Sequence, residues 1–154
     1  MKKLFLTFIA SVTLVSTTLH AESVPNIKTP TQTLLEYHEL SKTNLDFEIE
    51  ASHYSIEKQK EVIEKISLYA KAMKLESDEQ AKEKYMGFKS RTTKCLKLEP
   101  ISETVDNEFV NLEFSALDIC SEAPVNGDLA SFELKVRMIN EDGWKIDKYK
   151  LVIN

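Results

Sequence analysis

The stretch SFELKVRMINEDGWKIDKYKLVIN, residues 131–154, decides the fold. In its first half, apolar and polar side chains alternate over eight residues, as in a β-strand with one buried and one wet face. Residues 140–143 then read Asn-Glu-Asp-Gly, a composition that suits a tight turn with a left-handed glycine. In the second half, the apolar positions change parity near Asp147 and Lys148, which predicts a β-bulge. We therefore expect a long closing hairpin.

Two further strands precede this hairpin. Residues 92–104 and 108–120 are rich in strand-forming side chains, and a turn at 105–107 separates them. Pro100 interrupts the first of the two strands, which indicates an edge position or a bulge. The polar residues 121–128 are expected to form the loop that leads into the closing hairpin.

Helical spacing dominates the chain before residue 91. Thr29 and Pro30 suit the N-cap and first position of a helix that runs to about Lys42. A short helix is preferred for residues 45–54, although LDFEIE also alternates as a strand would. Further helices are expected from Ser55 to Lys74 and from a capping box at residues 77–80 to near Gly87. Their inward residues would be Val62, Ile63, Ile66, Tyr69, Ala70, Met73, Ala81, Tyr85 and Phe88.

Helices first and strands last is an α+β order, with N-terminal helices packed on a curved antiparallel sheet of about four strands. Residues 1–21 read as a secretory signal peptide, with Lys2 and Lys3, an apolar stretch and a cleavage point near Ala21. Residues 22–28 are then a flexible lead, and residues 29–154 form a single α+β domain. The expected location is the periplasm.

Charge limits the classes of partner. Removal of a leader with two lysines and no acidic residue changes the net charge from −5 to −7. An acidic surface argues against nucleic acid and anionic lipid as partners. The apolar part of the leader is too short for a permanent membrane helix, so no stable membrane insertion is expected.

Three segments carry a resemblance to a known fold. The turn in ISETVDNEFVNLEF, residues 101–114, the ending DGWKIDKY, residues 142–149, and the opening TPTQTLLEYHEL, residues 29–40, are similar to segments of the nuclear transport factor 2-like superfamily. This resemblance implies a cystatin-like α+β cone over the whole exported chain. Enzymes of the family place an aspartate, histidine or tyrosine set inside the cone, and no such motif can be matched here residue by residue.

Cys95 and Cys120 form the best-defined pair of chemically active residues. If Asp106 and Asn107 are the turn residues, Cys95 faces Asp118 and lies diagonal to Cys120, and a bulge would bring the cysteines closer. In an oxidising compartment two such cysteines usually form a disulfide. A redox-active thiol pair and a metal site are the alternatives, but the CxxC spacing and an adjacent histidine are both missing.

A pocket inside the cone is a second candidate site, with Asp118 or His38 as its polar contact. A plain aromatic core is the competing interpretation, and His38 and His53 fit a buried and a loop histidine. The candidate pocket residues are Tyr37, His38, Tyr69, Tyr85, Phe114, Asp118 and Trp144.

The sequence favours an exported binding domain without catalytic activity. Three glycines cannot build a glycine-rich phosphate loop, no catalytic serine motif occurs, and neither a cofactor nor a metal is expected. The partner would be a protein or small ligand of the cell envelope, for an accessory envelope factor or a toxin-immunity protein. The alternative is a small-molecule enzyme or carrier that uses the cone interior. A homodimer through the sheet face is compatible with both, and Glu133, Lys135 and Arg137 predict that this face is polar.

Overall fold

Four helices precede a four-stranded antiparallel sheet, which confirms the α+β expectation. The computed structural model describes residues 28–43, 45–120 and 131–153. The predicted signal peptide, nearly all of the predicted lead and the predicted loop at residues 121–128 lie outside these ranges. The elements are α1 (Pro30–Ser41), α2 (Phe47–Ala51), α3 (Ile56–Ala72), α4 (Asp78–Lys94), β1 (Leu96–Asp106), β2 (Phe109–Asp118), β3 (Ser131–Asn140) and β4 (Trp144–Ile153).

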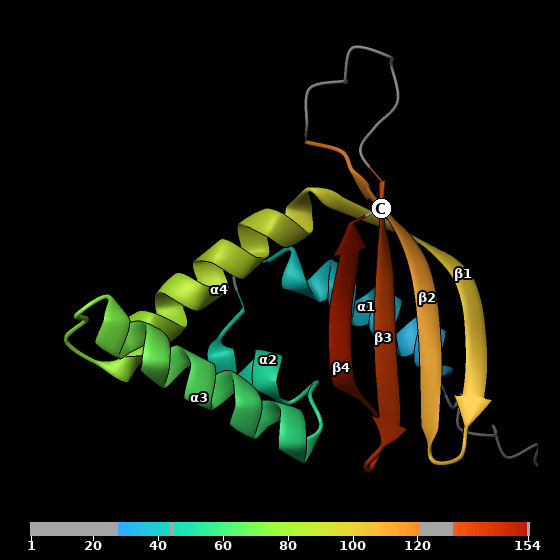
Figure 1. Cartoon of the computed structure of the whole chain (residues 1–154), viewed down its shortest axis with the longest axis horizontal. Helices are drawn as coiled ribbons and strands as arrows, with labels where there is room; N and C mark the ends of the chain where they lie inside the picture. Colours follow the sequence, from blue (N-terminus) through green and yellow to red (C-terminus); the bar gives the residue numbers. More distant parts are fainter. Residues whose placement is uncertain (1–27, 44, 121–130, 154) are drawn as a thin grey trace, which may run out of the picture.

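The sheet has the order β1-β2-β3-β4, so β1 and β4 are its edges. As Figure 1 shows, α1 crosses one face of the sheet, while α3 and α4 form a helical hairpin that projects beyond β4. The core lies between α1 and the sheet, where inward residues of β2 and β3 such as Leu112, Phe114 and Leu134 are fully buried. Within the described residues, no helix is long and apolar enough to cross a membrane.

The closing hairpin forms as predicted, including its bulge. Asn140 pairs with Trp144 around a three-residue turn in which Asp142 and Gly143 have positive φ, 53° and 113°. Arg137 pairs with Lys148 and Met138 with Ile146, so Asp147 is the extra residue of β4. Asp147 is buried at the bulge, where its carboxylate accepts hydrogen bonds from Arg137 Nε at 2.7 Å and from Ser55 Oγ at 3.1 Å.

The register of the first hairpin differs from the prediction. The turn residues are Asn107 and Glu108, so Val105 pairs with Val110 and not with Glu108. Asn107 takes the left-handed conformation, with φ of 55°, which asparagine tolerates better than most residues. The bulge expected at Pro100 is present on this edge strand, between Pro100 and Ser102.

The predicted helix beginnings are correct, but one helix end is wrong. Thr29 and Gln32 form a full capping box for α1, and Ser55 caps α3. At α4 the Ser77 hydroxyl caps the Gln80 N–H, whereas the Gln80 side chain bonds Glu76 N–H, so the predicted box is only half formed.

Helix α4 continues to Lys94 instead of ending near Gly87, and β1 begins at Leu96 instead of Thr92. A single glycine costs a helix about 1 kcal/mol, which a helix of this length absorbs. The preferred helix within residues 45–54 is confirmed as α2.

Candidate functional site

A buried polar cluster lies where α1, α2 and α4 meet. Its centre is Glu50 of α2, whose side chain is fully buried. The Glu50 carboxylate accepts hydrogen bonds from the hydroxyl groups of Tyr37, at 2.5 Å, and Tyr54. The Ser41 hydroxyl lies 3.4 Å from its second oxygen. Lys89 of α4 completes the cluster with an ion pair to Glu50 and hydrogen bonds to both tyrosine oxygens.

The electrostatics of this cluster follow from its burial. Burial lowers the pKa of Lys89 to about 7, because the ammonium loses its water, while the adjacent Glu50 carboxylate works in the opposite direction. Burial raises the pKa of Tyr37 and of Tyr54, so both stay protonated and donate to the carboxylate. The Lys89 ammonium also lies 4.9 Å from the Tyr37 ring centroid and 5.0 Å from that of Tyr54.

Lys89 is the chemically most versatile member of the cluster. An amine with a lowered pKa can accept a proton or attack a carbonyl group near neutral pH. However, the Glu50 carboxylate already has protein donors on both oxygens. The cluster is therefore organised as a satisfied buried network, and a substrate would have to displace one of its members.

The two histidines of the predicted exported chain flank Tyr37. His38 is buried, and its Nε2 lies 3.0 Å from the carbonyl oxygen of Leu96, so the neutral ring donates a hydrogen bond there. Burial lowers the pKa of His38, which favours the neutral form. The His53 ring lies 5.0 Å from the Tyr37 ring, and its pKa is also lowered by burial. Both placements fit the interpretation of one buried and one loop histidine without a catalytic or metal-binding role.

A groove between α3 and α4 is the second candidate site. It has a volume of about 1090 Å³, and Ile66 of α3 is buried beneath it. Tyr69 and Phe88 line the groove with 41% and 62% of their surface exposed. Phe88 was expected to point into the core, as were Ile63, Tyr69 and Met73. All four side chains are exposed, so these predictions are wrong. The remaining lining residues are Lys65, Gln80, Glu83, Lys84, Tyr85, Gly87 and Arg91.

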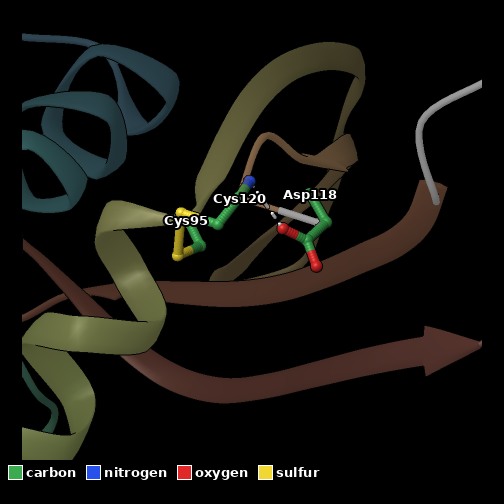
Figure 2. A group of neighbouring side chains, drawn as sticks. All are labelled: Cys95, Asp118 and Cys120. Atoms are coloured by element: carbon green, nitrogen blue, oxygen red, sulfur yellow. Dashed lines mark hydrogen bonds between the residues drawn. A yellow bond between two sulfur atoms is a disulfide. The ribbon is translucent and has the colours of Figure 1, made fainter. Parts of the chain in front are cut away.

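The predicted disulfide between Cys95 and Cys120 is confirmed (Figure 2), with 5.0 Å between the two Cα atoms. Cys95 is the C-cap of α4 and not a strand residue, and its carbonyl accepts a hydrogen bond from Ile119 N–H at 2.8 Å. Leu96, not Cys95, pairs with Asp118. The bridge therefore joins the end of the helical hairpin to the end of β2.

Asp118 lies beside the disulfide, and its Oδ1 accepts a hydrogen bond from Cys120 N–H at 2.9 Å (Figure 2). Among the described residues, Cys95, Asp118 and Cys120 bring potential metal-ligand atoms within 4.8 Å of one another. In the oxidised protein the two sulfur atoms are bonded to each other, so they do not offer the thiolates that a soft metal requires.

The residues predicted for one pocket occupy several environments. Tyr37 joins the buried cluster, and Tyr85 interacts with it through Tyr54. Phe114 is fully buried, whereas Tyr69 lines the groove on the helical hairpin. Trp144 is partly buried against the core, His38 bonds the backbone of Leu96, and Asp118 lies at the disulfide.

Sequence reasoning missed Glu50, Tyr54 and Lys89. The sequence gives little sign that Glu50 is buried, because a glutamate at this position of a short helix could equally face solvent. The residue pairs that meet here are separated by up to 52 positions, and periodicity does not report such contacts.

Comparison with known proteins adds no relative: no family model, no curated protein and no solved structure matches this chain. The resemblance to the nuclear transport factor 2-like superfamily therefore stays a prediction.

Proposed function

We propose that this chain is an exported, non-enzymatic domain that binds a partner protein of the cell envelope in the groove between α3 and α4. The observation that carries the proposal is the pair of exposed aromatic side chains, Tyr69 and Phe88, in a groove of about 1090 Å³. Aromatic residues at the centre of a concave surface supply much of the binding energy in protein interfaces.

The charge of the groove specifies the partner further. Its lining includes Lys65, Lys84 and Arg91 but only one acidic residue, Glu83. The chain as a whole carries a net charge of −5, so the groove is a locally basic surface on an acidic protein. A segment with apolar side chains and flanking carboxylates is complementary to it.

Export is supported by the leader-like residues 1–21 and by the disulfide, which is compatible with an oxidising compartment. If export is correct, the purified chain begins after Ala21, and the mass of the intact protein reports this directly. An accessory envelope factor and a toxin-immunity protein both fit a small binding domain. The partner recovered in the experiment below separates these two roles.

Photo-crosslinking tests the proposal. A photoreactive phenylalanine analogue at Phe88 is expected to give one discrete protein adduct in intact cells, identified by mass spectrometry. The control position is Val105 on β1, which is also exposed and apolar but lies on another part of the molecule. Equal adducts from both positions, or none from Phe88, contradict the proposal.

A second candidate function is a small-molecule enzyme or carrier that uses the interior next to the sheet. The buried pair of Glu50 and Lys89 favours it, since a buried amine with a lowered pKa is typical of sites that handle carbonyl groups. Treatment with a small aldehyde and borohydride would then label Lys89 selectively. Labelling spread over the exposed lysines, with Lys89 unmodified, would exclude this function.

We also propose membership of the nuclear transport factor 2-like superfamily. The order of helices before two antiparallel hairpins and the tryptophan after the last turn support this assignment. A related chain with a solved cone structure would test it.

A further inference from the structure

The edge of β4 already accepts one short piece of chain. Tyr54 forms a parallel β-bridge with Ile146. Ile146 N–H donates to the His53 carbonyl at 2.8 Å, and Ser55 N–H donates to the Ile146 carbonyl at 2.9 Å. The outer edge of β4 before the bulge is therefore already paired with residues 53–55.

This pairing stops at the bulge. Beyond Asp147, the described part of the chain provides no backbone partner for the outer edge of β4 at residues 148–152. In Figure 1 the helical hairpin lies beside β4, and the last turns of α4 approach the C-terminal end of this strand. The free edge has a length of about 17 Å at 3.3 Å per residue, which is a common strand length.

The side chains of this edge divide into two faces. Tyr149 and Leu151 pair with the buried residues Val136 and Leu134, so they lie on the helix-facing side of the sheet. Over β3 this side is buried, but Tyr149 and Leu151 remain 45% and 40% exposed. The apolar face of the sheet thus continues to its edge, where Tyr149 and Leu151 are only partly covered.

The opposite face of the edge is basic. Lys148 and Lys150 pair with Arg137 and Lys135 of β3. Arg137 is bound by Asp147, and Lys135 contacts Glu113 and Glu133. Among the described residues, neither Lys148 nor Lys150 has a carboxylate within ion-pair distance. Two positive charges on alternate residues of the edge thus stand without a partner of opposite sign.

We propose that residues 148–152 of β4 accept an extended segment of a partner protein as a fifth strand, with apolar residues beside Tyr149 and Leu151 and acidic residues beside Lys148 and Lys150. Strand addition supplies affinity through main-chain hydrogen bonds and specificity through alternate side chains. A second copy of this chain is disfavoured as occupant, because antiparallel pairing of two β4 edges brings lysines next to lysines. The site rests on the proposed protein-binding function but uses other residues than the groove, so either can fail alone.

Edge lysines also protect sheets from unwanted pairing. Under that interpretation the basic edge repels strands of every composition and has no preferred partner. The two interpretations differ in what an acidic, alternating peptide does.

The experiment uses the exported full chain and three synthetic octapeptides. The first alternates valine and glutamate, the second replaces glutamate by lysine, and the third is the acidic peptide N-methylated at alternate residues. We expect the acidic peptide to bind about tenfold more tightly than the basic one, since attraction replaces repulsion at two cross-strand pairs. N-methylation is expected to remove binding, because it deletes the ladder donors. Hydrogen exchange is expected to slow at residues 148–152.

Charge reversal provides the matched variants. The double substitution Lys148→Glu and Lys150→Glu is expected to reverse the preference between the acidic and basic peptides, whereas Lys97→Glu on the other edge strand leaves it unchanged. No binding, equal binding of the N-methylated peptide, or protection outside residues 148–152 would overturn strand addition. Dimerisation through β4, seen as a doubled mass in solution, would also overturn it. An adduct from Phe88 without strand addition leaves the groove function in place.

Discussion

Polar and apolar side chains are distributed in opposite ways in two regions of the molecule. These regions are the interior between α1, α2 and α4 and the outer surface of the α3–α4 hairpin. In the interior, a charged pair and two phenols are buried, and each polar group has a partner. On the hairpin, large apolar side chains remain exposed, although a core is nearby. These are Ile63, Leu68, Tyr69, Met73 and Phe88.

The contrast suggests that the interior network determines stability, whereas the hairpin surface serves recognition. A buried charge that loses its partner costs several kcal/mol, so the interior network constrains how α1, α2 and α4 can pack. An exposed aromatic side chain contributes little to folding, because its removal exposes little new apolar surface. The interior should therefore respond strongly to substitution in stability measurements, and the hairpin surface should respond in binding measurements.

The largest expected effect is that of Glu50→Gln. This substitution leaves Lys89 buried without its counter-charge and should lower the free energy of unfolding by about 3 to 5 kcal/mol at pH 7. Without the carboxylate the pKa of Lys89 falls further. The loss should therefore shrink as the pH rises through about 7, where the parent protein also releases the Lys89 proton, and should be nearly constant above about 8.

Urea titrations at pH 6.5 and 9 measure both effects. The control is Glu48→Gln on the same helix, whose carboxylate contacts Lys82 at the surface and should matter little. A loss below about 1 kcal/mol for Glu50→Gln would mean that the cluster is not a stabilising network.

Reduction of the disulfide is expected to have the next largest effect. Cys95 and Cys120 are 25 residues apart, so the double substitution to serine should lower the free energy of unfolding by about 3 kcal/mol. Because the bridge holds the end of α4 to the end of β2, hydrogen exchange should increase there first. Equal stability of the serine variant and the oxidised protein would contradict a structural role.

A smaller effect is expected from His38. Its folded-state pKa lies below the unfolded value of about 6.5, so below this pH the unfolded state binds more protons. Stability should therefore fall as the pH drops from 6.5 towards the folded-state pKa. Thermal unfolding of His38→Asn should depend less on pH in this window. An unchanged slope would assign the acid sensitivity to other groups, with His53 as the next to be replaced.

The smallest effect is expected on the hairpin surface. Phe88→Ser should change the free energy of unfolding by less than about 0.5 kcal/mol, because Phe88 is exposed. A Phe114→Ser variant in the core provides the opposite extreme in the same denaturation series. A loss of more than about 2 kcal/mol for Phe88→Ser would show that the groove is part of the core.

Local sequence signals predicted much of the fold. The alternation in residues 131–154, the parity change at Asp147 and the caps at Thr29 and Ser55 each act over a few residues, so they could be read without tertiary information. The disulfide was predictable because antiparallel pairing brings its cysteines together even when the register is shifted.

The candidate sites were harder to predict. Periodicity shows that Tyr69 and Phe88 belong to apolar faces, but it does not show whether another element covers them. Glu50 and Lys89 come from different helices, and their meeting depends on how α2 and α4 pack. The sequence therefore predicted well which helices and strands form, but poorly which side chains these elements bury against one another.

The most direct test of the groove is the yield of the Phe88 crosslink in two variants of α3. Tyr69 lines the groove, whereas Leu68 is the neighbouring exposed apolar residue and does not line it. We predict that Tyr69→Ser abolishes the adduct while Leu68→Ser retains it, with both variants as stable as the parent chain. Equal yields in the two variants would contradict the assignment of the groove as the binding site.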